Sequence, residues 1–212
     1  MALALVEHGR TNQLDIERNR LTAHLQASNS LAPVASVYAF LENARDSYRL
    51  CSSGACGSRI QRADYQFVVI PGQSTASNGP ASDVYHVRCF ERILGAQLAQ
   101  YLEFLLPTNC HSWSERGLLA YESNSSIILD YGATAILEEF KARQGVYTQY
   151  TFWREMDDHT TWSLNRISKP TEPAIDPVDN WSIITDYVEN GNGLADGLTR
   201  WKTAKVSAQT QR

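Results

Sequence analysis

The stretch "RLCSSGACGSRI", residues 49–60, contains two of the four cysteines of the chain, Cys51 and Cys56. Four residues separate the two cysteines, and Gly54 and Gly57 supply the backbone freedom that a tight turn around a metal ion needs. In structural zinc sites, four Cys or His side chains surround one ion, and they usually come in two close pairs. This stretch is therefore a candidate for the first pair of ligands.

The candidate second pair lies in "DVYHVRCFERIL", residues 83–94, where two residues separate His86 from Cys89. A His-x-x-Cys pair at the start of a helix places both side chains on one side, about one turn apart. The 29 residues between Cys56 and His86 contain a predicted strand, a loop and a short return strand, which can bring the two pairs together. The sequence therefore predicts one tetrahedral Zn²⁺ site with the ligands Cys51, Cys56, His86 and Cys89.

Two other interpretations of these residues remain open. Free cysteine is often buried as a small apolar side chain, in which case His86 is simply a hydrogen-bonded strand residue. A disulfide is the other alternative. The start of the chain, "MALALVEHGR", lacks the basic region and full apolar core of a secretory signal. We therefore expect an intracellular, reducing compartment, in which clustered cysteines more often bind metal or react.

The composition limits the classes of function. Of the 212 residues, 43% are hydrophobic and 20% are charged, as in ordinary folded proteins, and the net charge is −4. An acidic balance argues against a general polyanion binder, although a local basic face is compatible with it. No run of 18 apolar residues occurs, so we expect no membrane partner.

The apolar pattern predicts an α+β, mostly helical fold, in which a small zinc-finger module of short antiparallel strands and a helix is embedded among packed helices. Residues 1–47 are expected to form a helical hairpin, with helices over 12–27 and 33–45. The polar face of the first helix carries Glu17, Arg18 and Arg20. Residues 48–106 contain the zinc finger: a strand over 64–70, a return strand at "VYHV" and a long helix that follows Cys89 and stops at Pro107.

The second half is expected to contain more helix and one hairpin. Residues 107–169 contain a predicted amphipathic helix over 133–143. The segments "VYTQYTFW" and "TTWSLNRI" alternate apolar and polar residues and predict a β-hairpin, with a helix as the alternative for the first of them. Residues 170–212 are expected to form a Pro-rich strap, a C-terminal helix over 181–189 and a weakly basic end.

The order of these features resembles the zinc finger of the poly(ADP-ribose) polymerase (PARP) type, over residues 44–94. That family pairs two close cysteines with a later His-x-x-Cys, with aromatic residues before the histidine and after the last cysteine. In this chain the first pair is spaced by four residues rather than two, and the loop over 71–83 has no aromatic or large aliphatic residue. The matching positions here are Tyr85 and Phe90 beside the second pair, Tyr48 and Arg49 before the first, and Arg59 and Arg62 before the strand.

The resemblance implies a Cys3His zinc site and recognition of DNA, in which basic residues near the finger contact the phosphate backbone. We therefore expect a zinc-binding protein of the nucleus that binds DNA and is not an enzyme. The candidate phosphate contacts are Arg45, Arg49, Arg59 and Arg62.

Two other functions are alternatives to DNA binding. The first is a zinc-stabilised adaptor that binds another protein through the aromatic-rich second half, because exposed aromatic residues favour protein interfaces. The second is catalysis at the adjacent Cys110 and His111, which is disfavoured because neighbouring residues rarely present a nucleophile and a base to each other. The tryptophans of the second half are Trp113, Trp153, Trp162, Trp181 and Trp201.

Overall fold

The computed structural model describes residues 2–27, 37–45, 48–70, 82–109, 112–116, 127–155 and 193–210, with side chains over 13–26 in the first helix and up to residue 145 in α4. The predictions for Cys110 and His111, for "TTWSLNRI" and for a helix over 181–189 lie outside these residues. The elements in chain order are α1 (Ala2–Ala27), β1 (Tyr38–Asn43), β2 (Tyr65–Ile70), β3 (Asp83–His86), α2 (Val87–Leu94), the 3₁₀ helix η1 (Gly95–Phe104), β4 (Leu105–Pro107), α3 (Trp113–Arg116), α4 (Tyr131–Glu155) and α7 (Leu194–Thr210).

The centre of the fold is a four-stranded sheet with the order β3-β2-β1-β4. β1 pairs antiparallel with β2, from Tyr38↔Ile70 to Asn43↔Tyr65, and parallel with β4, while β3 pairs antiparallel with β2. The two inner strands each bury four consecutive residues. Continuous burial of this kind requires both faces of a sheet to be covered.

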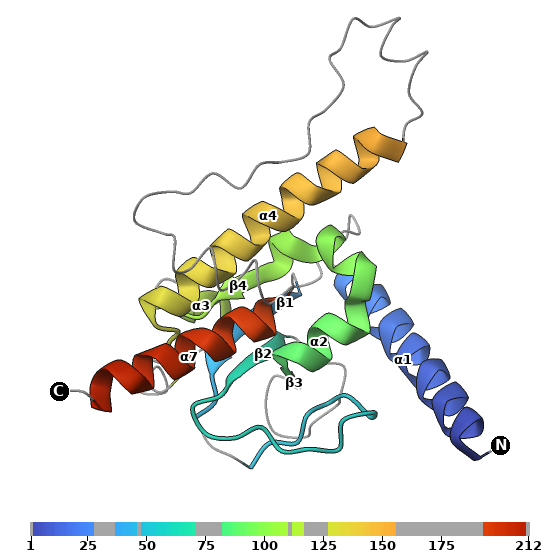
Figure 1. Ribbon diagram of the computed structural model, residues 1–212, viewed down its shortest axis with the longest axis horizontal. Helices are drawn as coiled ribbons and strands as arrows, with labels where there is room; N and C mark the ends of the chain where they lie inside the picture. The colour runs from blue at the N-terminus through green and yellow to red at the C-terminus, as the bar shows by residue number, and fades with distance from the viewer. Residues whose placement is uncertain are drawn as a thin grey trace, which may run out of the picture.

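Helices from both ends of the chain cover this sheet (Figure 1). α2 packs on the sheet and contacts α1 on one side and α7 on the other, and α7 also packs against α4. The rings of Phe67 in β2 and Phe90 in α2 lie 4.5 Å apart between their centroids, which joins the sheet to the helical layer. The α+β fold class and the strands predicted at 64–70 and "VYHV" are confirmed. Among the described residues, no helix combines the length and the hydrophobicity needed to cross a bilayer.

The predicted helix over 33–45 is wrong in its described part, because residues 38–43 form strand β1. Val37, Tyr38 and Leu41 have helical spacing, but they belong to a nearly continuous apolar run, and such a run fits a buried strand equally well. β1 has a hydrogen-bonded neighbour on each side, β2 and β4. These pairings, which come from residues far along the chain, decide the structure of this segment.

The single long helix predicted after Cys89 is also wrong. α2 ends at Leu94, and the chain continues as the 3₁₀ helix η1 and then as strand β4. The break lies at Gly95, whose φ of 52° is in the left-handed region that an α-helix cannot accommodate. Apolar spacings of three and four persist through η1, so periodicity alone did not reveal the break.

The predicted helix over 133–143 is confirmed as part of α4, but the β-hairpin prediction is wrong for "VYTQYTFW". Those residues, 146–153, continue α4, which runs from Tyr131 to Glu155. The helical alternative for this segment is therefore the correct one.

The first helix is longer than predicted. α1 begins at Ala2, ten residues before the predicted start at 12.

The C-terminal helix α7 was not predicted, because its buried face is short. Only Leu194, Ala195, Gly197 and Leu198 of this helix are buried. Its N-terminus is held by Glu91 of α2, whose carboxylate accepts the backbone N–H groups of Leu194 at 2.6 Å and Ala195 at 3.1 Å. Burial raises the pKa of Glu91, and these two hydrogen bonds oppose that shift. The contact joins the C-terminal end of the chain to the helix that carries Cys89.

A second junction joins α7 to α4 through Asp130. Its carboxylate accepts hydrogen bonds from the indole N–H of Trp201 at 3.0 Å, the backbone N–H of Ala133 at 2.8 Å and the hydroxyl of Tyr65 at 3.1 Å. Burial alone would raise the pKa of Asp130, but these donors and the nearby Lys205 outweigh it and hold the pKa below its usual value. One carboxylate thus joins β2, α4 and α7.

The ring of Trp201 in α7 packs directly against Gly132 of α4, so we expect Gly132→Ala to destabilise the fold. A Cβ there would overlap the indole ring of Trp201, so the indole has to move away from Asp130. We expect a loss of about 1–3 kcal/mol in the free energy of unfolding, measured by denaturant titration of tryptophan fluorescence.

Gly145→Ala is the matched control, because Gly145 lies on the same helix and its Cβ would meet nothing within 4 Å. A Gly-to-Ala change at an open helical position is expected to stabilise by about 0.5–1 kcal/mol. Equal effects of the two substitutions would contradict the described packing of α7 on α4.

Candidate metal centre

The first pair of predicted ligands lies on a short antiparallel ribbon. Leu50 bridges to Arg59 across this ribbon, and the backbone N–H of Cys51 donates to the carbonyl of Ser58 at 3.0 Å. The turn closes through Gly57, whose φ of 62° is in the left-handed region. The loop that carries the two cysteines is therefore a compact knuckle; residues 49–60 are called the knuckle below.

The knuckle is attached to strand β3, which ends at the third predicted ligand. The backbone N–H of Ser52 donates to the carbonyl of Val84 at 2.7 Å, and the N–H of Val84 donates to Ser52 Oγ at 3.0 Å. This pairing places Cys51 next to His86, the last residue of β3. Because α2 starts at Val87, the fourth ligand Cys89 follows within the first turn of that helix.

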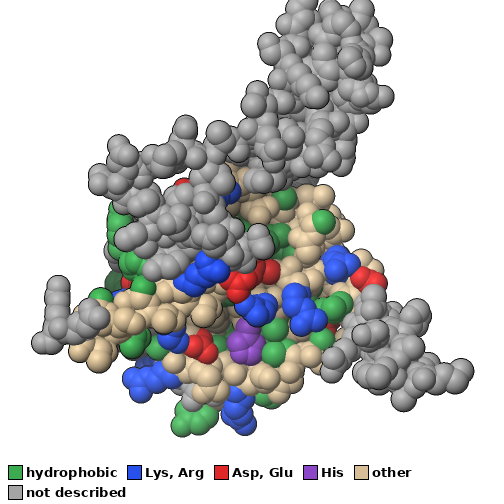
Figure 2. Space-filling view, in the orientation of Figure 1, with side chains coloured by type: hydrophobic (Ala, Val, Ile, Leu, Met, Phe, Trp, Pro, Cys, Tyr) green, Lys and Arg blue, Asp and Glu red, His purple; other side chains and the backbone are tan. Residues whose placement is uncertain are grey.

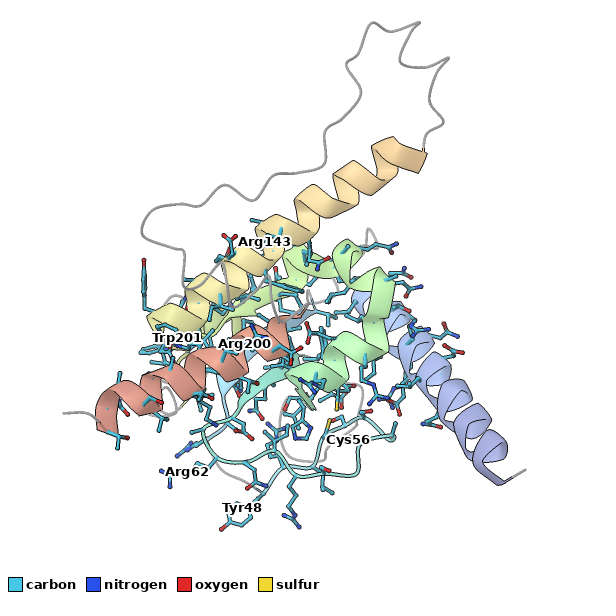
Figure 3. All side chains as sticks on the ribbon, viewed as in Figure 1. Tyr48, Cys56, Arg62, Arg143, Arg200 and Trp201 are labelled. Atoms are coloured by element: carbon cyan, nitrogen blue, oxygen red, sulfur yellow. The ribbon has the colours of Figure 1, made fainter. Side chains whose placement is uncertain are left out.

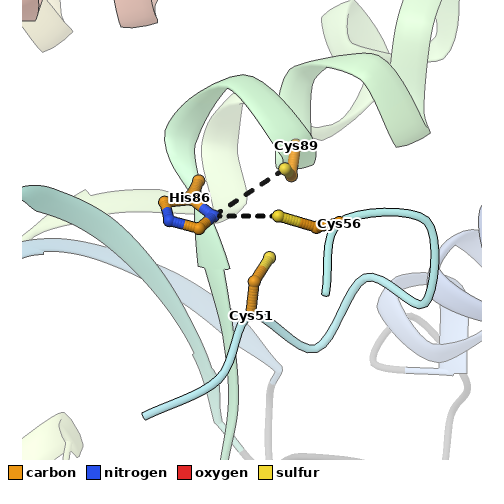
Figure 4. Close-up of side chains that lie close together, drawn as sticks. All are labelled: Cys51, Cys56, His86 and Cys89. Carbon is orange, nitrogen blue, oxygen red and sulfur yellow. Dashed lines mark hydrogen bonds between the residues drawn. The ribbon is translucent and has the colours of Figure 1, made fainter. Parts of the chain in front are cut away.

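The structure brings the four predicted ligands together (Figure 4). Their ligand atoms all lie within 4.8 Å of one another. His86 Nδ1 is 3.4 Å from Cys56 Sγ and 3.9 Å from Cys89 Sγ. Metal–ligand bonds of the lengths found in zinc sites place neighbouring donor atoms of a tetrahedron about 3.5–3.8 Å apart. The geometry of the cluster therefore fits a single tetrahedral metal ion, and these residues form a group that can hold one.

The environment of the cluster favours a thiolate at Cys51. A hydrogen bond with the Cys89 thiol lowers the pKa of Cys51 to about 5, assisted by backbone N–H groups of Ser53 and His86 and opposed by burial. The same contact with Cys51, together with burial, raises the pKa of Cys89. Thiolate is the form of cysteine that binds metal. The three cysteines of the cluster are free rather than joined in a disulfide.

The partial burial of the cluster agrees with a closed site. Cys51 is buried, and Cys56, His86 and Cys89 are half-buried. Four protein ligands complete a tetrahedron and leave no open position for a substrate or a reactive water, which separates structural sites from catalytic ones. An ion bound by all four residues would join the knuckle, β3 and α2.

Comparison with protein-family models, with curated proteins and with solved structures finds no match to this chain.

The four arginines predicted as phosphate contacts are all exposed; Arg49 and Arg59 lie in the knuckle, and Arg62 follows it by two residues. Arg49 donates to Ser82 Oγ at 2.8 Å, and Arg59 donates to the carbonyl of Tyr48 at 3.1 Å. Arg45 and Arg62 form no ion pair with other described residues. Figure 3 shows Tyr48 and Arg62 projecting from the knuckle side of the molecule, away from α4.

A cleft of about 310 Å³ adjoins the centre where α7 passes the starts of α2 and β2. Two ion pairs join α7 to these elements: Lys202 contacts Asp64 at 2.5 Å, and Asp196 pairs with Arg88. The visible face of the molecule carries several Lys and Arg side chains close to a histidine (Figure 2). The cleft is lined by His86, Val87 and Arg88 with Asp64 and Tyr65, and by Ala195, Leu198, Thr199, Lys202 and Thr203 of α7.

The sequence interpretation missed Glu17 as a residue of the site. It was assigned to the polar face of the first helix, but its side chain is buried and contacts the knuckle. The sequence does contain an indication that Glu17 is buried. Leu14, Glu17 and Leu21 are spaced by three and four residues, so they share one face of a helix. A carboxylate on an apolar stripe indicates a buried polar contact.

Two of the tryptophans on which the adaptor alternative depends have described side chains. Trp113 and Trp201 are both half-buried, and Trp201 packs over Gly132. The side chains of Trp153, Trp162 and Trp181 lie outside the described residues. The large apolar side chains exposed in the described part include Tyr48, Leu50 and Tyr131, at 77%, 57% and 80%.

Proposed function

We propose that the chain binds one structural zinc ion through Cys51, Cys56, His86 and Cys89, and that the zinc-stabilised module binds DNA. The observation that carries the first part is the convergence of three thiols and one imidazole nitrogen within 4.8 Å. Zinc is preferred because it accepts thiolate and imidazole ligands together and has no geometric demand that opposes a tetrahedron. The ion would hold the knuckle against α2 and present the surface formed by the knuckle.

The surface of the knuckle supports the second part. Residues 48–63 include Arg49, Arg59 and Arg62 and contain no acidic residue, although the whole chain has a net charge of −4. Phosphate contacts by Arg and Lys supply most of the affinity for nucleic acid. The exposed ring of Tyr48 lies on the same segment, and aromatic side chains stack on bases. The module is thus similar to a PARP-type finger in its ligand order and in its basic residues, and a nuclear location would accompany this function.

Replacing Arg59 and Arg62 by Ala is expected to weaken binding to duplex DNA and to reduce its salt dependence. Each lost phosphate contact lowers the slope of log K against log salt by about 0.9, so the double variant should lose roughly 2 units of slope. Fluorescence anisotropy with a labelled duplex between about 50 and 200 mM salt measures both quantities.

The matched control replaces Arg92 and Arg200 by Ala, which removes the same charge from exposed positions on α2 and α7. The control is expected to keep most of the affinity. Salt-insensitive binding, undetectable binding or an equal loss in the control would contradict the proposed DNA surface.

The zinc-stabilised adaptor is the second candidate, and the exposure of Tyr131 at the start of α4 favours it. If the zinc-loaded chain does not bind DNA, the adaptor becomes the favoured function. Tyr131→Ala would then be the variant to test against a protein partner.

A further inference from the structure

Helix α1 contributes a buried carboxylate to the knuckle. The side chain of Glu17 is only 5% exposed. Its Oε2 accepts a hydrogen bond from Ser53 Oγ at 2.8 Å, and its Oε1 accepts bonds from the backbone N–H of Gly54 at 2.8 Å and from Gln13 Nε2 at 3.1 Å. Within the described residues no cation forms an ion pair with Glu17. Its burial is stabilised by these three donors, so the carboxylate is held where they converge.

Ser53 links this carboxylate to both cysteines of the first pair. Its hydroxyl donates to Glu17, and its backbone N–H donates to the sulfur of Cys51. Its carbonyl accepts the backbone N–H of Cys56 at 3.0 Å. A displacement of Glu17 would therefore act on the backbone that orients both thiols.

α1 and the knuckle approach each other closely at Gly54, where the absence of a side chain leaves room for Glu17. A Cβ at Gly54 would lie 2.9 Å from Glu17 Oε1 and 3.1 Å from Gln13 Nε2. Since Gly54 lies between Cys51 and Cys56, the carboxylate contacts the loop between the two cysteines of the first pair. A side chain there would push Glu17 away without changing any charge.

α1 is also fixed to the helix that carries the second pair. Arg18, the next residue along α1, donates through Nε to the carbonyl of Ile93 in α2 at 2.7 Å. Leu21 and Leu25 of α1 are buried in the core. α1 therefore contacts both segments that supply ligands, the knuckle through Glu17 and α2 through Arg18.

We propose that Glu17 is a positioning residue of the metal centre, which holds the knuckle in ligating geometry and couples metal binding to the docking of α1. The proposal rests on the proposed zinc site and deepens it. Residues that orient metal ligands raise affinity because the ligands no longer have to be ordered when the ion binds. Coupling is reciprocal, so bound metal must in turn stabilise the docked position of α1.

Glu17→Gln tests the proposal, because it keeps the size of the side chain and removes one acceptor from a site with three donors. We expect zinc to bind about 10–100-fold more weakly in competition with a chromophoric chelator. Gly54→Ala should weaken binding in the same direction by steric displacement. Glu103→Gln is the control: it removes the same charge from an exposed carboxylate of η1, outside both contacts of α1.

Hydrogen–deuterium exchange provides a readout that a purely structural role would not move. Zinc is expected to slow amide exchange over residues 13–26 in the wild type, and this slowing should be lost or reduced in Glu17→Gln. Zinc affinities of Glu17→Gln and Gly54→Ala equal to that of Glu103→Gln would overturn the proposal, even if both variants were less stable.

Two further outcomes keep the conclusions separate. If the wild type itself binds no zinc, the proposed function fails, whatever the variants do. If Glu17→Gln does not fold, Ser53→Ala and Gly54→Ala decide, because each alters the knuckle side of the contact and keeps the charge of the carboxylate.

Discussion

Cys56→Ser is expected to reduce the zinc content from one ion per chain to none and to cause a large loss of stability. Three remaining ligands bind zinc far more weakly than four, and the knuckle, β3 and α2 lose the ion that joins them. With free zinc at about a thousand times the dissociation constant, the bound ion adds about 4 kcal/mol to the free energy of unfolding. For a chain of this size that corresponds to a fall in Tm of roughly 8–16 °C.

The measurements are elemental analysis of metal per chain and thermal unfolding with and without a chelator. A chelator should lower the Tm of the wild type and leave that of Cys56→Ser unchanged. Cys110→Ser is the matched control, because it removes the remaining cysteine of the chain and should retain the ion. Full zinc content in Cys56→Ser, or its loss in Cys110→Ser, would show that the ligand set is wrong.

Arg116→Ala is expected to destabilise the fold by about 3–5 kcal/mol, because it leaves a buried carboxylate without its cation. Glu42, in the central strand β1, is 2% exposed. Its carboxylate pairs with the guanidinium of Arg116, which reaches it from α3 through both terminal nitrogens, one of them 3.1 Å from Oε1. Gln66 Nε2 donates to the same carboxylate at 2.8 Å. Denaturant titration measures the loss as a lower midpoint.

A double substitution separates loss of the pair from loss of one partner. Glu42→Gln combined with Arg116→Met removes both charges, so it should recover much of the stability that Arg116→Ala loses. Lys202→Ala provides the contrast, because the Lys202–Asp64 pair is about 40% exposed on each side and its loss should lower stability by less than about 1 kcal/mol. Equal effects of Arg116→Ala and Lys202→Ala would contradict the buried pair.

The four candidate ligands could be found from sequence because their identity and spacing are local properties. A C-x4-C loop containing glycine and a His-x-x-Cys at a helix start each present their two side chains together, whatever the rest of the chain does. The meeting of the two pairs depended only on an antiparallel return between β2 and β3, and aromatic and β-branched residues indicate those strands. In the structure, β2 and β3 pair antiparallel as expected, and the two pairs of candidate ligands lie together.

Other elements could not be predicted because they depend on distant partners. The run in residues 38–43 fits a helix or a strand, and pairing with both β2 and β4 selects the strand. α7 buries only one short face, so its sequence has little periodicity, and its position depends on the carboxylate of Glu91 and on the packing of Trp201 over Gly132. Glu17 was on the apolar stripe of α1, but the sequence contained no sign of the donors that it would meet.

By itself, the sequence determined the chemistry of the site: the types of ligand, their two pairs and the glycines that let the knuckle turn. The tertiary structure alone decided what surrounds those ligands, namely α1 behind the knuckle, α7 beside His86 and the Arg116–Glu42 pair in the sheet. The physical reason is the range of the interactions. Side-chain identity and turn geometry act over a few residues, whereas burial, strand pairing and charge compensation depend on residues that only folding brings into contact.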